Sequence, residues 1–304
     1  MSMFTDKQGK LQPLWAFVFS LILSALAFFV SGNIAHEAAD QKPFRSEFFF
    51  RILWMLLLFG IYVWMLTVGD HLEEHRIAAQ GLPRTRGWLK QFILGCVMGG
   101  GLMLLAIAPI HFWGTLRTHL LMTWNKLPNL GAVFLMLLCG ALAEELVFRG
   151  YPFQHLERAL GPVRAVLVFS ILYGLLHLLN PFANRWGIAN SILIGILLSL
   201  AYLRTRALWL PWGIHFAWNA TLGLLFGLPV SGIRVLNLWT YTDAFGPNWL
   251  TGGQYGVEAS VTGTAVIVFG ILLVWKLPFA ELAQPARRVP AEAALKDPVS
   301  SIQS

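Results

Sequence analysis

Five polar side chains interrupt the most apolar stretches of this sequence. They comprise two adjacent carboxylates, two imidazoles and one carboxamide: Glu144, Glu145, His177, His215 and Asn219. An ionisable side chain in a transmembrane helix costs roughly 2.5 kcal/mol or more, so it normally has a partner or a function. Carboxylates and imidazoles transfer protons in general acid–base catalysis, and a carboxamide can stabilise a developing oxyanion. The spacing of these residues decides whether they can act together.

The two glutamates cannot share one target. Neighbouring residues on a helix point about 100° apart, whereas Glu145 and Arg149 are four residues apart and lie on one face. We therefore expect Arg149 to pair with Glu145, and Glu144 to face the interior of a helix bundle. The alternative is that both glutamates form a solvated helix end, since ionisable residues near the ends of spans commonly reach water.

His177 can meet Glu144 if the intervening chain forms a helical hairpin. Gly161-Pro162 is a turn signal, and Glu144 lies about 17 residues before it while His177 lies about 15 after it. At 1.5 Å per residue, the two side chains would lie within about one turn of the same depth. A lone histidine on an apolar face is more often structural, and this interpretation competes with the catalytic one.

His215 and Asn219 are four residues apart and so share one face of a helix. Counted from Arg206, His215 lies about 14 Å into its span. Interhelical hydrogen bonds in membranes contribute only about 0.6 kcal/mol on average, so stability alone does not explain these polar groups. The sequence predicts that Glu144, His177, His215 and Asn219 converge in one buried pocket.

Transmembrane helices are the elements that must position these residues. Of the 304 residues, 57% are hydrophobic and 12% are charged, against roughly 25% charged in a soluble domain. A hydrocarbon core about 30 Å thick needs about 20 helical residues. Eight runs fit or nearly fit: Leu14–Val30, Phe48–Val68, Gln91–Ile110, Leu130–Phe148, Val163–Leu179, Ile188–Leu203, Leu208–Leu228 and Val261–Leu277. The fold predicted is an all-α, polytopic bundle of about eight spans.

The basic residues favour cytoplasmic termini. With both ends inside, the inner segments carry 15 Lys and Arg residues and the outer segments carry 6, as the positive-inside rule requires. We expect a multi-pass protein of a bacterial inner membrane. Residues 1–278 form its transmembrane domain, with a catalytic core at about 130–228, and 279–304 form a disordered cytoplasmic tail. The net charge of +7 is scattered over loops, so nucleic acid is not an expected partner.

Two segments carry expectations about packing. The outer loop Pro229–Ser260 is expected to lie flat on the outer surface, because it holds four residues of interfacial type: Trp239, Tyr241, Trp249 and Tyr255. The third span holds a patch of small residues that favours close helix packing: Gly95, Gly99, Gly100 and Gly101.

Three motifs occur in order in the second half of the chain: Glu144-Glu145-x-x-x-Arg149, a histidine four residues after an aromatic, and His215-x-x-x-Asn219. Together they resemble the CAAX prenyl protease and bacteriocin-processing (CPBP) family of intramembrane endopeptidases, over about Leu130–Leu228. The resemblance implies a peptidase that cleaves a membrane-associated peptide or protein, with or without a prenyl lipid. The substrate itself and the oligomeric state do not follow from it.

The resemblance also implies roles for single residues. Glu144 and His177 would activate water, while His215 and Asn219 would line the pocket and help to stabilise the oxyanion. Glu145, tied to Arg149, would have a supporting or secondary catalytic role. The aromatic before His177 is Tyr173, where the family usually has Phe, and its hydroxyl could tune the pocket.

A metal is left open by the resemblance. Glu144, His177 and His215 could bind zinc as one carboxylate and two imidazoles, with water in the fourth position. A metal-free mechanism uses the same residues and is favoured by the absence of an HExxH pair. The inverted zincin pattern HxxEH at His71–His75 has no evident third ligand and is interpreted as part of a solvated helix.

Two other classes of function compete with the peptidase. One is a non-catalytic immunity or scaffolding factor, since fold does not fix function. The other is a proton-coupled transporter that uses Glu144 and His177 as a relay, although the sequence shows no internal repeat.

Overall fold

The computed structural model describes residues 81–278, with gaps at 84–86, 114–115, 122–123, 125–126 and 236–238, and a few single positions between 12 and 22. The predicted span Phe48–Val68, the pattern at His71–His75 and the tail 279–304 lie outside the described residues, as does most of the span Leu14–Val30.

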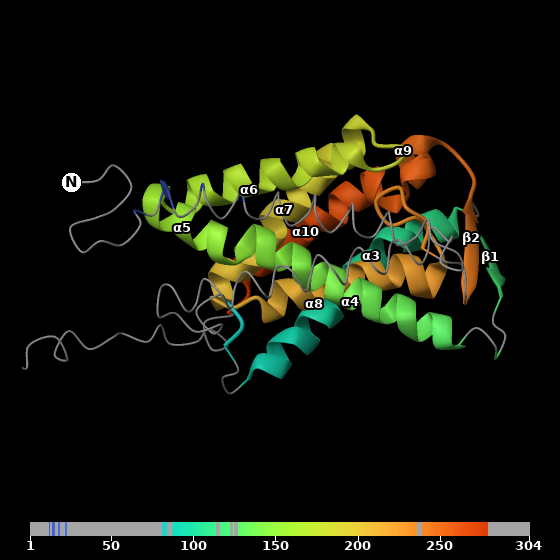
Figure 1. The fold of residues 1–304 in the computed structure, drawn as a ribbon. Coiled ribbons are helices and arrows are strands. Elements are labelled where there is room, and N and C mark those ends of the chain that lie inside the picture. The colour runs from blue at the N-terminus through green and yellow to red at the C-terminus, as the bar shows by residue number, and fades with distance from the viewer. Residues whose placement is uncertain are drawn as a thin grey trace, which may run out of the picture.

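Seven helices of ten or more residues form a bundle in the described part of the chain (Figure 1): α3 (Trp88–Phe112), α4 (Leu127–Arg149), α5 (Tyr151–Leu160), α6 (Pro162–Leu176), α7 (Arg185–Thr205), α8 (Trp209–Ala220) and α10 (Val261–Lys276). Within the described residues, four stretches are long and apolar enough to cross a membrane: Trp88–Phe112, Asn129–Leu160, Pro162–Leu179 and Arg185–Thr205. The protein is therefore a helical membrane protein. The all-α class is confirmed apart from one two-stranded sheet, and the number of eight spans stays a prediction.

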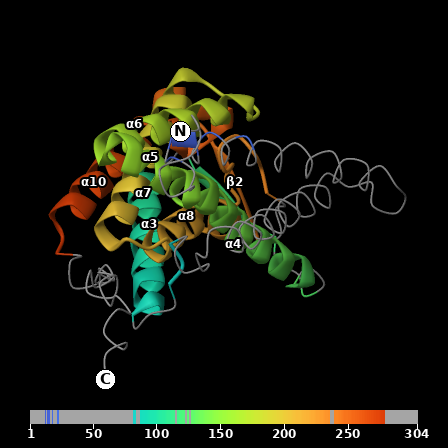
Figure 2. The same cartoon turned by 60° about the vertical axis from the view of Figure 1, so that its left-hand side comes forward.

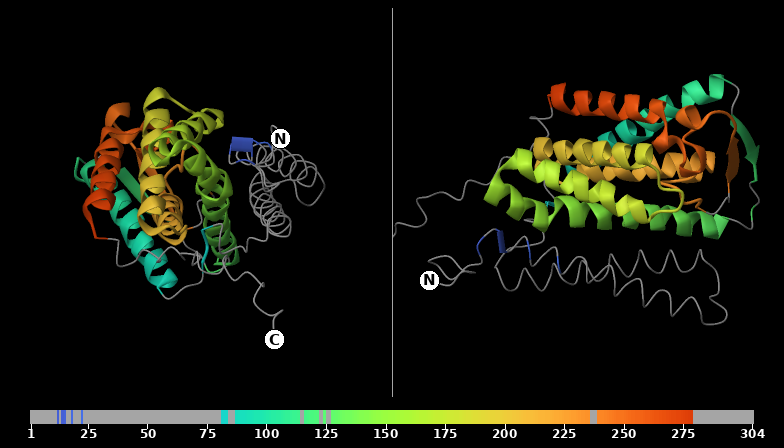
Figure 3. Two further views of the ribbon diagram at one scale, coloured as in Figure 1. Left: turned by 90° about the vertical axis from the view of Figure 1, so that its left-hand side faces the viewer. Right: turned by 90° about the horizontal axis from the view of Figure 1, so that it is seen from above.

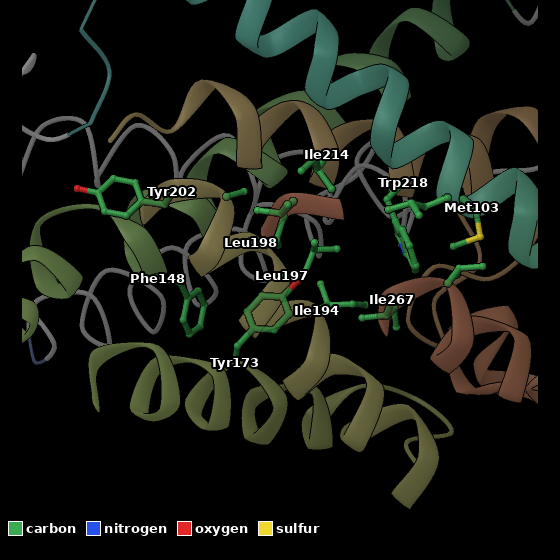
Figure 4. Packing of buried hydrophobic residues seen from close by; sticks show 14 of the residues in the cluster. Met103, Phe148, Tyr173, Ile194, Leu197, Leu198, Tyr202, Ile214, Trp218 and Ile267 are labelled. Atoms are coloured by element: carbon green, nitrogen blue, oxygen red, sulfur yellow. The ribbon is translucent and has the colours of Figure 1, made fainter. Parts of the chain in front are cut away.

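The helices are arranged so that α7 and α8 lie inside the bundle. Figures 2 and 3 show α10 and α4 on opposite sides, with α7 and α8 between them. The central core is made of large apolar side chains from several helices (Figure 4), among them Met103, Ile194, Leu197, Ile214 and Ile267. Such a core fixes the helices that carry the polar residues.

The predicted hairpin turns at Gly161. Helix α4 ends at Arg149, and α5 continues the same arm to Leu160. Gly161 then takes a positive φ of 85°, and Pro162 begins α6. Proline suits this first position because its missing N–H would have no intrahelical partner. The Gly161-Pro162 turn is thus confirmed.

Glycines bring α3 against α8, as the patch of small residues predicts. A Cβ on Gly95 would lie 2.3 Å from the carbonyl oxygen of Leu210, and one on Gly99 would lie 2.1 Å from that of Ile214. Gly213 of α8 lies equally close to α3, since a Cβ on it would lie 2.2 Å from the carbonyl oxygen of Phe92. Close packing is confirmed for Gly95 and Gly99 but not for Gly101, where a Cβ would meet nothing within 4 Å.

The loop between α8 and α10 folds into a structured cap at one end of the bundle, with α5 at the other end (Figure 1). Strand β2 (Thr240–Ala244) pairs antiparallel with β1 (Leu116–Leu120), and three short helices follow: α9 (Asn248–Thr251), η5 (Gly253–Tyr255) and η6 (Val257–Ala259). Tyr255 is 1% exposed, whereas Trp249 is 58% exposed. The expectation of a flat surface loop is therefore wrong for Tyr255, because turns built on positive-φ glycines fold the chain back onto the helices.

Candidate active site

Glu145 is the buried centre of the site. Its side chain on α4 has no exposed surface, and its Oε1 lies 2.8 Å from Nδ1 of His215 and 3.3 Å from Nη1 of Arg149. The predicted pair of Glu145 with Arg149 is confirmed. The other oxygen, Oε2, is buried and has no hydrogen-bond partner among the described residues.

The contact between Glu145 and His215 assigns the proton of the imidazole. An ionised carboxylate only accepts hydrogen bonds, so Nδ1 of His215 must donate. In the neutral ring, Nε2 is then an acceptor. This nitrogen lies 3.7 Å from Oε2 of Glu144.

Glu144 lies at the edge of the site instead of in the bundle interior. Its side chain is 31% exposed, whereas that of Glu145 has no exposed surface. The expectation that Glu144 faces the interior is therefore wrong, because the rotation of α4 turns Glu145 towards His215. Glu144 nevertheless approaches the free nitrogen of the same imidazole, so both carboxylates converge on one ring.

A separation of 3.7 Å is too long for a direct hydrogen bond between Glu144 and His215. It is short enough for one water molecule to lie about 2.8 Å from both atoms, at the apex of a triangle. A carboxylate and an imidazole nitrogen that share a water are the arrangement that general base catalysis requires.

Arg149, the last residue of α4, links the site to α6 and α7. Its buried guanidinium donates to Oγ of Ser199 at 3.4 Å and to the carbonyl of Gly195 at 3.1 Å, both on α7. It also lies 5.6 Å from the ring centre of Phe148 and 4.9 Å from that of Tyr173 on α6. Arg149 thus neutralises Glu145 and fixes it relative to α6 and α7.

Tyr173 packs against both imidazoles. Its ring centre lies 4.6 Å from that of His177 and 6.3 Å from that of His215. His177 begins η3 (His177–Leu179), the 3₁₀ turn that follows α6, and its Nδ1 lies 2.8 Å from the carbonyl oxygen of Tyr173. Because a carbonyl accepts, Nδ1 donates and Nε2 is left for another partner.

His177 and Asn219 are linked less directly to the group formed by Glu144, Glu145 and His215. Within the part of the chain that the structure describes, His177 forms no ion pair with Glu144 and packs instead against Tyr173. Asn219 follows His215 by one turn of α8 and is half-buried. The structure therefore brings three of the predicted residues together, and the convergence of His177 and Asn219 with them stays a prediction.

The predicted zinc ligands do not form a metal site in this arrangement. Among the described residues, no three His, Cys, Asp or Glu side chains are grouped so that they could hold a metal ion. Nδ1 of His215 is engaged by Glu145, and Nδ1 of His177 by the carbonyl of Tyr173, which leaves Nε2 of each ring as the nitrogen that a metal could take. Zinc binding therefore stays a prediction, as does the metal-free mechanism that uses the same residues.

Two polar residues that the sequence analysis did not single out lie next to α8. The indole Nε1 of Trp218 donates to Oε1 of Glu258 at 2.9 Å, and both side chains are buried. Glu258 comes from the cap, forty residues further along the chain. Only its position just before the last apolar run could have drawn attention to it.

Comparison with known families identifies one match. Residues 126–221 match the family described as "Type II CAAX prenyl endopeptidase Rce1-like". Comparisons with curated proteins and with solved structures give no significant match. The matched segment runs from just before α4 to just after α8 and includes Glu144, Glu145, His177, His215 and Asn219. The resemblance to the CPBP family of CAAX proteases is therefore confirmed for the part of the chain that carries the site.

Proposed function

Because residues 126–221 are similar to the type II CAAX prenyl endopeptidases, we propose that this protein is an intramembrane endopeptidase that hydrolyses a peptide bond of a membrane-associated substrate. The observation that carries the proposal is the chain of contacts from Glu144 through His215 to Glu145. These groups lie in a helical membrane protein, where such polar residues are costly. A catalytic role accounts for that cost.

Glu144 is the general base of the proposed reaction. Its carboxylate takes a proton from the water that it shares with Nε2 of His215, and the resulting hydroxide attacks the carbonyl carbon of the substrate. The exposed side of Glu144 allows water and substrate to reach it. Glu145 holds the His215 ring in place through Nδ1, so that Nε2 faces the water.

The tetrahedral intermediate carries a negative oxygen that needs donors. The carboxamide of Asn219 can donate to it, whereas the neutral ring of His177 cannot, because its Nδ1 already donates to the carbonyl of Tyr173 and its Nε2 only accepts. The proton held by Glu144 then passes to the leaving amide nitrogen as the C–N bond breaks, which yields a carboxylic acid and an amine and returns Glu144 to its carboxylate form. Tyr173 packs against the rings of both His177 and His215.

The setting of the reaction is also part of the proposal. The substrate is a peptide or protein held at or in a bilayer, with or without a prenyl group. We place the enzyme in a bacterial inner membrane with both termini in the cytoplasm, as the distribution of Lys and Arg favours. A non-catalytic scaffold or a transporter has no comparable support in the contacts of the site.

The decisive test compares the wild-type protein with Glu144→Gln. Membranes from cells that make either form are searched for peptide fragments, and the substrate found is then tested with purified protein. Removal of a general base lowers the rate by about 10² to 10⁴-fold. We expect a loss of this size without a change in thermal unfolding.

Glu157→Gln is the matched control, since Glu157 lies on α5 and pairs with Arg206 at 2.8 Å, away from the site. It should cleave at the wild-type rate. A chelator added to the purified enzyme should leave cleavage intact, whereas a loss that zinc restores would support the zinc prediction. Equal cleavage by wild-type protein and Glu144→Gln would rule out the proposed mechanism.

A further inference from the structure

A second buried carboxylate holds α8 from the side of the cap. Glu258 in η6 is 4% exposed, and its Oε1 accepts from Nε1 of Trp218 at 2.9 Å. Its Oε2 accepts from the backbone N–H of Ser231 and from its hydroxyl at 3.0 Å. Both oxygens are thus satisfied by neutral donors, and among the described residues no cation pairs with this carboxylate.

The backbone around Glu258 is fixed independently of α8. Asn190 of α7 donates to the carbonyls of Glu258 and Ser260, at 2.7 and 3.2 Å. Thr264 of α10 donates to Oδ1 of Asn190 at 2.8 Å. Glu258 therefore projects from a rigid base on α7 and α10, and its side chain is the part that reaches α8.

Trp218 lies among the site residues of α8. It follows His215 by three residues and precedes Asn219 by one. At about 100° per residue, Trp218 points about 60° to one side of His215 and Asn219 about 40° to the other. The core view shows Trp218 packed deep in the bundle (Figure 4).

The contact between Glu258 and Trp218 lies close to the end of the regular part of α8. Below it, α8 is held by Glu145 through His215 and by the glycines of α3 through Gly213. Directly after Ala220 the helix widens into the π-helix η4 (Thr221–Phe226), so the next turn does not continue the regular α-helical spacing. Trp218 is the last anchored side chain before that change.

We infer that Glu258 is a positioning residue for the proposed hydrolysis: by binding Trp218, it sets the rotation of α8 that presents Asn219 to the site. The inference rests on the proposed function. It concerns a residue outside the matched segment 126–221. Side-chain tips lie about 5 to 6 Å from a helix axis, so a rotation of about 10° moves a tip by about 1 Å. A displacement of about 1 Å can cost about 10²-fold in rate.

The test uses Glu258→Gln and Trp218→Phe in the full-length protein, with the substrate found for the wild type. A glutamine presents its NH₂ group to Trp218 or to the N–H of Ser231, so one donor loses its acceptor. We expect kcat to fall by about 10 to 100-fold, with KM changed by less than about twofold. The double variant should lose no more than the more impaired single variant, because both act through one contact.

Thr251→Val is the control for a merely structural effect. It removes the hydrogen bonds of the Thr251 hydroxyl with the carbonyl of Pro247 and the N–H of Gly253, which lie in the same cap and involve no residue of α8. It should lower the unfolding temperature to a similar extent but keep kcat near that of the wild type. If Glu258→Gln does not fold, the kcat of Trp218→Phe tests the positioning role. In that variant Glu258 still accepts from the N–H and the hydroxyl of Ser231, so the cap keeps its own contacts.

The outcomes separate the two proposals. A wild-type protein that cleaves nothing contradicts the proposed function itself. A cleaving wild type with kcat unchanged in Trp218→Phe and Glu258→Gln overturns only the positioning role. The positioning role is also overturned if Thr251→Val loses as much kcat as these two variants do, or if the losses of the two single variants multiply in the double variant.

Discussion

Replacement of Arg149 by methionine tests how the buried charges are balanced. Methionine keeps most of the side-chain stem in the space between α4, α6 and α7 but removes the guanidinium. Glu145 would then be a fully buried carboxylate with one remaining donor, His215. The carbonyl of Gly195 and the hydroxyl of Ser199 would lose their donor as well.

The expected loss follows from the geometry of the pair. Breaking a buried ion pair by removing one partner costs about 3 to 5 kcal/mol. The contacts of Arg149 with Glu145 and Ser199, at 3.3 and 3.4 Å, are longer than the usual hydrogen-bond distance. We therefore expect the lower end of the range, about 3 kcal/mol in the free energy of unfolding.

The assay is equilibrium unfolding of the purified protein in mild detergent. Arg158→Met serves as the control, because Arg158 is exposed on α5 and its replacement should change the free energy by less than about 0.5 kcal/mol. The double variant Arg149→Met with Glu145→Gln should recover more than half of the loss, since it no longer buries an unpaired charge. The argument fails if Arg149→Met is as stable as Arg158→Met, or if the second change adds to the loss.

Two further predictions concern packing and the cap. Gly99→Ala would place a methyl group 2.1 Å from the carbonyl oxygen of Ile214 and should destabilise the protein by about 1 to 3 kcal/mol. Gly101→Ala in the same helix should be neutral or stabilising, because a Cβ there would meet nothing within 4 Å. Unfolding of both variants in detergent measures the difference, and equal effects would contradict the prediction. Burial raises the pKa of Tyr255 to about 12. The contribution of this shift to stability is therefore present below pH 10 and lost between about pH 10 and 12. The unfolding temperature of Tyr255→Phe should fall less than that of the wild type between these pH values. Curves of unfolding temperature against pH that run parallel for the two proteins would contradict the prediction.

Local patterns predicted much of the structure. The lengths of the apolar runs predicted the long helices. The Gly161-Pro162 turn signal predicted the hairpin that brings His177 back towards α4. The four-residue spacing of Glu145 and Arg149 gave their pair. These features depend on residues that are near one another in sequence, and helix geometry alone relates them.

The roles of Glu144 and Glu145 could not be separated in the same way. Helix α4 is apolar on all sides, so the sequence holds no polar face that would fix its rotation in the bundle. The rotation depends on what packs around it, including the hydrogen bonds from Arg149 to Ser199 and to the carbonyl of Gly195 on α7. Only the packed structure shows that Glu145 faces inwards.

The structure of the cap could not be predicted from the sequence for a different reason. Its path depends on glycines with positive φ, such as Gly252 and Gly256, which turn the chain back between the helices. The contacts of Glu258 with Trp218 and of Asn190 with the cap join residues that are far apart in the chain. Periodicity carries no information on such pairs.

The sheet has a consequence for the order in which the chain folds. Strands β1 and β2 flank the segment from α4 to α8, and Thr118 and Thr242 join them through their hydroxyls at 3.0 Å. During synthesis, β1 emerges before this segment and β2 after it, so β1 has no partner while α4 to α8 are inserted. Pairing over so long a separation is slow, because the loop must close before the contacts form. A nascent chain that ends before Thr240 would already contain both carboxylates and both imidazoles of the site, yet the ends of the segment that carries them would still be free.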